Sequence, residues 1–252
     1  MADLKEAQMP FIKNLASSDR VLRTASLESL QTFLSSRRTL PQTDALKLWK
    51  GLFYALWMTD RPLPQQRLTS DLASLLHTAI RPACAPNWLA AFWAVMGLQW
   101  SEIDNLRMQK YLLLVRRVFN AQIAWCKERG YEGEEVDKVE EMMKEWCFEE
   151  EGTDLKRVPV GLRLHVLDIW VDELEREGAL EDEQAEGFVK RMGTMVELLK
   201  RSPIKTVRER AEESFEDERL PWGKKADADE EEGEATNGQD DSDGEGWGGF
   251  DD

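Results

Sequence analysis

Apolar residues recur at every third or fourth position along almost the whole chain before Pro221, which is the spacing of one face of an α-helix. In that region no segment alternates strictly as a strand would, and no Asn-Gly or Asp-Gly pair marks a hairpin turn. Prolines stand where such helices would begin or end. The pattern predicts about ten helices, over residues 10–16, 18–36, 42–58, 64–80, 86–100, 103–129, 133–148, 159–177, 181–201 and 203–217.

The most aromatic stretch, LWKGLFYALW, lies in the helix predicted over 42–58. A platform for stacking nucleic-acid bases would need several aromatic rings on the basic face of this helix, and only Tyr54 is there. We therefore interpret the other aromatic residues as core. On a helical wheel the wide apolar face consists of Ala45, Leu46, Trp49, Leu52, Phe53 and Leu56, with Lys47, Lys50 and Tyr54 opposite and Trp57 at the boundary.

The helix predicted over 159–177 carries two apolar stripes rather than one, so we expect it to be covered on both sides. Such burial is typical of helix pairs stacked in layers. The segments DRVLRTASLESL (19–30) and SPIKTVRERA (202–211) are loosely similar to the inner helices of HEAT repeats, although no strict period of about 40 residues is visible. The sequence thus predicts an all-α fold, an irregular HEAT-like α-solenoid.

Charge is distributed unevenly along the 252 residues, which have a net charge of −16. Residues 1–120 contain 15 basic and 9 acidic residues, whereas residues 226–252 contain 12 acidic residues and no basic one. The final stretch has no helical pattern and little apolar content, as is typical of disordered segments. We expect one folded domain over 1–220 and a disordered acidic tail over 221–252. The basic first half could face an anionic partner although the whole chain is acidic.

Residues with catalytic or metal-binding chemistry are sparse. His77 and His165 lie within apolar helical segments, and the three cysteines show no paired spacing. No nucleophile, zinc-protease or nucleotide-binding motif is present. We interpret the carboxylates of 132–154 as the solvent-exposed face of a helix. We therefore expect no enzyme activity, metal, cofactor or small-molecule substrate. No apolar run approaches the roughly 18 residues of a membrane helix, so we expect a soluble intracellular protein with no membrane partner.

Basic side chains of the first half are the best candidates for a binding surface. Arg107, Lys110 and Arg117 share one face of the helix predicted over 103–129, and Arg116 points away from it. If neighbouring helices expose such faces along one edge, they form a phosphate-binding ridge; the alternative is that each is a solvated surface charge. The candidate ridge consists of Arg20, Arg23, Arg37, Arg38, Lys47, Lys50, Arg61, Arg67, Arg107, Lys110 and Arg117.

Four segments together resemble the ribosomal RNA processing protein 1 family, a nucleolar family also described as Nop52-type. They are FIKNLASSDRVLRTASLESLQTFLSSRR (11–38), LKLWKGLFYALWMTDRPLPQQRLTSDLASLLH (46–77), FWAVMGLQWSEIDNLRMQKYLLLVRRVF (92–119) and PVGLRLHVLDIWVDEL (159–174). The motif KLWKGLFYxxWMxDxPLxQQ is long and specific, and the resemblance covers roughly residues 9–217. Longer animal members have extended basic C-terminal regions, whereas this chain has an acidic tail.

The resemblance implies a nucleolar assembly factor of the large (60S) ribosomal subunit, not a nuclease. It implies association with early pre-60S particles and a need for the factor in maturation of the 27S-type precursor RNA, including the first internal transcribed spacer. The implied partners are precursor rRNA, other nucleolar assembly factors and ribosomal proteins. Two readings remain open, a scaffold that touches RNA through the basic half and a protein-only adaptor within the particle. An enzyme would need a carboxylate cluster for metal ions, and none is well placed.

The turn that follows the aromatic stretch, residues 59–66, is polar, and two prolines restrict its geometry. Structured exposed loops on a rigid scaffold often carry function. We therefore expect this turn, with Arg61, Gln65, Gln66 and Arg67, to contact a partner protein or ribosomal RNA. Tyr54, Gln65 and Gln66 are the candidate partner-binding residues.

Overall fold

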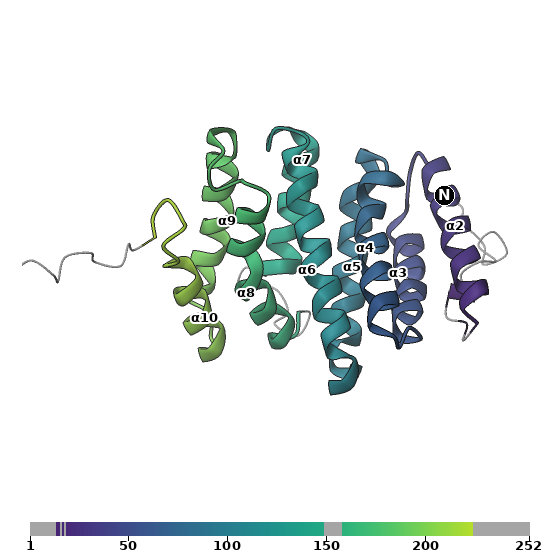
Figure 1. Ribbon diagram of the computed structural model, residues 1–252. Coiled ribbons are helices and arrows are strands. Elements are labelled where there is room, and N and C mark those ends of the chain that lie inside the picture. The colour runs from purple at the N-terminus through teal and green to yellow at the C-terminus, as the bar shows by residue number, and fades with distance from the viewer. Residues whose placement is uncertain (1–13, 16, 18, 149–157, 224–252) are drawn as a thin grey trace, which may run out of the picture.

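A computed structural model describes residues 14–15, 17, 19–148 and 158–223 of the chain (Figure 1). These residues form nine α-helices and no strand. The α-helices are α2 (Arg20–Ser36), α3 (Gln42–Trp57), α4 (Pro62–Thr78), α5 (Ala85–Gln99), α6 (Asn105–Lys127), α7 (Glu134–Met143), α8 (Val160–Arg176), α9 (Glu186–Leu199) and α10 (Lys205–Phe215). Short 3-10 turns occupy Pro82–Cys84, Trp100–Glu102 and Glu183–Ala185, and a π-helical turn spans Lys144–Phe148.

The helices stack side by side from α2 at one end to α10 at the other (Figure 1). In one layer α4 packs on α6, α6 on α8 and α8 on α10. In the second layer α3 packs on α5 and α5 on α7, and α9 continues the row by packing on the π-helical turn that follows α7. Contacts of α3 with α4 and of α9 with α10 join the two layers, and this stacking confirms the predicted all-α solenoid.

Nine of the predicted helices are present with ends shifted by a few residues. The largest differences are at α9, which begins only at Glu186 after a separate 3-10 turn, and at the end of α7, where the last predicted turn is π-helical. The helix predicted over 10–16 falls almost wholly outside the described residues, where only 14 and 15 are helical. The predicted acidic tail also lies outside them from residue 224 onward.

Aromatic side chains form the centre of the fold, as the pattern in α3 predicts. Trp49 is 2 % exposed, and its indole N–H donates to the carbonyl of Trp88 at 2.9 Å. The ring of Phe53 stacks on that of Tyr111 at a centroid distance of 4.5 Å. Burial of α3 extends beyond the predicted face to Leu48, because α3 is covered by neighbours on more than one side.

The packed body continues past α10. Trp222 donates its indole N–H to the carbonyl of Phe215 at 3.0 Å, and the two rings lie 5.3 Å apart. Leu220 is 4 % exposed. Residues on both sides of the predicted domain boundary at 220 therefore pack on the fold.

Candidate functional site

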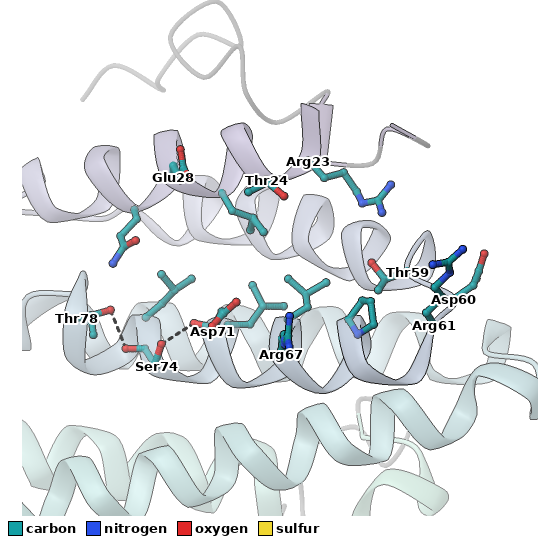
Figure 2. A pocket seen from close by; sticks show the side chains of 16 residues that line it. Arg23, Thr24, Glu28, Thr59, Asp60, Arg61, Arg67, Asp71, Ser74 and Thr78 are labelled. Atoms are coloured by element: carbon teal, nitrogen blue, oxygen red, sulfur yellow. Dashed lines mark hydrogen bonds between the residues drawn. The ribbon is translucent and has the colours of Figure 1, made fainter. Parts of the chain in front are cut away.

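A groove of about 670 Å³ lies between α2 and α4 (Figure 2). The groove lies at the α4 end of the layer formed by α4, α6, α8 and α10, on the side where α2 faces α4. Leucines of the two helices form its apolar floor, and hydroxyl and charged side chains form its walls. The floor consists of Leu27, Leu68, Leu72 and Leu75.

The groove collects three of the predicted ridge residues at one end. Arg23 from the first turn of α2, Arg61 at the start of α4 and Arg67 from its second turn all line this end, where both helices begin (Figure 2). The guanidinium of Arg23 also donates to the carbonyl of Ser17 at 2.6 Å. The side chains of Arg61 and Arg67 form no ion pair or hydrogen bond with the described part of the chain. Both are therefore available to an external anion.

Lys110 does not belong to an exposed ridge, which corrects the sequence prediction. Lys110 is 5 % exposed, and its ammonium donates to the carbonyls of Trp57 and Thr59 at 2.9 and 3.0 Å. Burial lowers the pKa of this lysine, and the Asp60 carboxylate partly opposes that shift. The helical wheel placed Lys110 on a polar face of α6, but that face packs against the end of α3.

The two arginines that share this face of α6 are partly exposed, and both are bound by other groups of the protein. The Arg107 guanidinium binds the Asp104 carboxylate and lies 4.6 Å from the centroid of the Trp57 ring. The Arg117 guanidinium donates to the carbonyl of Gln66, and burial lowers its pKa. These contacts tie α6 to its neighbours. Arg116, which points elsewhere as predicted, binds Asp172 and Glu173 on α8.

A second exposed basic group lies at the connection between α2 and α3. Arg37 is half-buried, with its guanidinium 4.1 Å from the centroid of the Phe33 ring, and Arg38 is exposed. The Cys84 thiol donates to the Arg38 carbonyl at 3.5 Å, which brings exposed Arg81 to the same corner. Sequence analysis missed Arg81, since only the packing of this connection against Cys84 brings it near Arg38. We call Arg37, Arg38 and Arg81 the basic corner.

The remaining predicted residues whose side chains are described lie at the surface. Lys47 and Lys50 are exposed on α3, and Lys47 lies 4.0 Å from the buried Asp44 carboxylate. Tyr54 is 36 % exposed and donates its hydroxyl to Gln99 at 3.4 Å. Arg20 begins α2, but its side chain lies outside the described part of the structure.

The predicted turn over 59–66 is largely helical, which is a second correction. Pro62 occupies the first turn of α4, where its missing N–H is tolerated, so the helix begins two residues earlier than predicted. Gln65 is half-buried and donates to the Thr59 carbonyl at 2.9 Å, whereas Gln66 is exposed. The turn is thus held against the fold through Gln65. Its exposed residues are Asp60, Arg61, Pro62, Leu63 and Gln66.

His165 is half-buried and the three cysteines are buried in the fold. His165 lies 3.0 Å from the Leu112 carbonyl, and burial lowers its pKa. Burial raises the pKa of the Cys84, Cys126 and Cys147 thiols, which disfavours the thiolate needed for nucleophilic or metal chemistry. Across the described ranges, no three histidine, cysteine or acidic side chains are grouped to hold a metal ion. None of the helices described there has the length and apolar content to span a bilayer.

Comparison with known proteins places the chain in a family. The family model described as nucleolar protein, Nop52, matches residues 6–246. Ribosomal RNA processing protein 1 homolog B of Homo sapiens is 33 % identical over 184 residues, which cover 71 % of this chain and 24 % of the human protein. Homolog A of Mus musculus is 30 % identical over 179 residues, which cover 69 % of this chain and 35 % of the mouse protein.

A Drosophila melanogaster homolog of ribosomal RNA processing protein 1 is 27 % identical over 174 residues, which cover 67 % of this chain and 25 % of the fly protein. This chain therefore spans between 24 % and 35 % of the length of these three relatives. The chain belongs to the Nop52 family of nucleolar proteins.

Proposed function

We propose that this protein is a non-enzymatic assembly factor of the large ribosomal subunit that acts in the nucleolus. It would join early pre-60S particles and be required for processing of 27S-type precursor rRNA, including the first internal transcribed spacer. One observation carries the proposal. The chain matches a nucleolar family over 6–246, and its curated relatives are named for processing of ribosomal RNA.

The proposed mechanism is that of a scaffold. A solenoid presents long rigid surfaces on which RNA and other assembly factors can be held in a fixed arrangement. The exposed charges of the basic corner, together with Lys47 and Lys50, would contact RNA phosphates. Such contacts position an RNA without reading its bases, and they weaken as salt rises. Lys110 takes no part, because its ammonium is bound to carbonyls inside the protein.

Ultraviolet crosslinking of the full chain in living cells, followed by sequencing of the attached RNA, tests this proposal. We expect reads to cluster in one region of large-subunit precursor RNA. Replacing Arg38 and Arg81 together by glutamine should reduce the crosslinked RNA, whereas Arg201→Gln, an exposed arginine at the other end of the solenoid, should leave it unchanged.

The alternative is a protein-only adaptor within the same particle. Sucrose-gradient sedimentation of the same cells separates the two. Co-migration with pre-60S particles, without crosslinked RNA above background, would support the adaptor. Absence from these particles, with 27S processing intact after depletion, would refute both.

A further inference from the structure

The groove between α2 and α4 interrupts an otherwise continuous layer of helices. Beyond it α4 packs on α6, α6 on α8 and α8 on α10, each with direct contact. The side chains that line the groove on α4 recur from Pro64 to Thr78 at intervals of three and four residues. This spacing produces the ridges into which another helix packs. The α4 wall of the groove therefore has the surface pattern of a helix–helix interface, and α2 forms the opposite wall.

Arginines outnumber acidic residues at one end of the groove, where Asp60 is the acidic lining residue, and acidic side chains line the groove farther along (Figure 2). Arg23, Arg61 and Arg67 lie at the end where α2 and α4 both begin, and helix N-termini add partial positive charge there (Figure 2). Glu28 and Asp71 line the groove farther along the helices. The carboxylates of Glu28 and Asp71 form no ion pair in the described part of the chain. A uniformly negative nucleic acid would meet repulsion from them.

Exposed apolar side chains gather at the same end. Val21 and Leu22 on the first turn of α2 are 74 % and 45 % exposed, and Leu63 on the first turn of α4 is 65 % exposed. Large apolar side chains exposed next to polar walls mark protein interaction sites. These three side chains do not line the groove itself, but they belong to the helix turns that border its basic end.

We propose that this groove binds an amphipathic α-helix of another protein. Its apolar residues, spaced by three and four, would pack on Leu27, Leu68 and Leu75, which keep more exposed surface than Leu72. Its acidic end would lie against Arg61 and Arg67, and a basic residue farther along would face Glu28 and Asp71. Pro64 to Thr78 spans roughly 20 Å at 1.5 Å per residue, so the bound helix has about four turns. Helix-in-groove recognition of this kind uses anchors at i, i+3, i+4 and i+7.

The inference stands on the groove alone and does not require the proposed role in ribosome assembly. Three other occupants would produce different results in its test. An RNA strand, a second copy of this chain, or residues 1–13 of the same chain could each cover the groove instead. The test therefore identifies the occupant chemically before its affinity is measured.

The first step is site-directed photocrosslinking of the full chain in cells. A photoreactive phenylalanine analogue replaces Thr24 on the α2 wall or Ser74 on the α4 wall, both of which are exposed. The same analogue in place of Glu209, exposed on α10, is the control position. We expect both groove positions to crosslink one segment of another protein, and mass spectrometry of the crosslinked peptide reads its sequence. That segment should have apolar residues spaced by three and four, with acidic residues at one end.

The second step measures binding of that segment, as a labelled synthetic peptide, to the purified full chain by fluorescence anisotropy. Arg61→Glu combined with Arg67→Glu should weaken binding at least tenfold, and Arg201→Glu should not change it. Replacing the acidic residues of the peptide by lysine should restore binding to the double variant. Because Arg61 and Arg67 have no internal partner in the described residues, the thermal midpoint of the double variant should match that of the original protein.

Several results would overturn the proposal. They are crosslinks to RNA only, crosslinks within the chain to residues 1–13, crosslinks between isotopically light and heavy copies of the chain, and a groove signal no stronger than that at Glu209. A peptide whose affinity is unaffected by charge reversal at Arg61 and Arg67 would also overturn it. None of these results bears on sedimentation with pre-60S particles, which tests the proposed function separately.

Discussion

The ammonium of Lys110 on α6 donates a hydrogen bond to the backbone carbonyl of Thr59, 51 residues earlier in the chain, at 3.0 Å. It also donates to the carbonyl of Trp57, the last residue of α3, at 2.9 Å. The last carbonyls of a helix lack partners within the helix and carry partial negative charge. Lys110 thus closes the end of α3 and joins it to α6.

Replacing Lys110 by methionine should lower the free energy of unfolding by about 2 to 3 kcal/mol, because the Trp57 and Thr59 carbonyls lose a charged donor. Lys50→Met is the matched control, since Lys50 is exposed and should change stability by less than about 0.5 kcal/mol. Urea denaturation gives both values. Equal stability of the two variants would show that the bonds of Lys110 contribute nothing to the fold.

Arg191 on α9 and Glu140 on α7 form a two-bond ion pair, with both distances 2.7 Å. The Glu140 side chain is 9 % exposed, so Arg191→Met should leave its carboxylate buried without a partner. We expect a loss of roughly 2 to 4 kcal/mol, somewhat reduced because Arg191 is half-exposed. The double variant with Glu140→Met should recover part of this loss, and chemical denaturation of the three proteins measures it. If the double variant is the least stable of them, the predicted penalty for an unpaired carboxylate is wrong.

Gly193 in α9 leaves space for the Trp222 ring, since a Cβ built at this glycine would lie 2.3 Å from Trp222 Cζ2. Gly193→Ala should therefore displace the ring and destabilise the protein by about 1 to 3 kcal/mol. Gly187→Ala in the same helix is the control. There the new Cβ would meet Arg191 Nη1 at 3.2 Å, a milder contact, and the gain in helix propensity should keep the change within about 1 kcal/mol.

Thermal unfolding of these two variants tests this contrast. In a background with Trp222→Ala the effect of Gly193→Ala should shrink, because the clashing ring is gone. A Gly193→Ala protein as stable as Gly187→Ala would mean that Trp222 does not pack on α9.

Stability should depend on pH through His165. Burial lowers the pKa of His165 below its ordinary 6.5, and the nearby Arg116 charge adds to that shift. At pH values between the folded and unfolded pKa of His165, the unfolded chain therefore binds a proton at this histidine that the folded chain does not bind. The contribution of this histidine is fully present above about pH 6.5 and is lost as pH falls toward the lower folded pKa, at up to about 1.4 kcal/mol per pH unit.

His165→Gln removes the titrating group but keeps an N–H that can reach the Leu112 carbonyl. Urea midpoints at pH 7.5 and 5.0 should fall less for this variant than for the original protein. A parallel decline in both would show that other groups, such as carboxylates, account for the whole pH dependence.

Much of the fold could be predicted from the sequence because helical spacing and core burial are local properties. The two apolar stripes of 159–177 became a helix buried on both sides, with Leu162 and Leu174 each at most 1 % exposed. The start of α4 was missed by two residues because Pro62 is equally compatible with a loop and with the first turn of a helix. Such choices depend on what the neighbouring turn packs against.

At the candidate site, the exposure and grouping of the charged side chains could not be predicted from local sequence. Lys50 and Lys110 both lie on polar faces of amphipathic helices, yet one is exposed and the other is 5 % exposed. The difference lies in α3, whose end meets α6 only in the folded solenoid. In the same way Arg23 and Arg61 are 38 positions apart in sequence, and the stacking of α2 beside α4 brings them to one end of a groove.

The sequence by itself therefore determined the helical class, the buried aromatic residues and the family, since these follow from periodicity, composition and extended motifs. Only the tertiary structure decided which charges reach solvent, that Arg81 joins Arg38 at a corner, and that α2 and α4 leave a groove. The physical reason is that a charge on a helix becomes buried, paired or available according to the helices packed beside it. Those neighbours are fixed by burial of apolar surface across the whole chain.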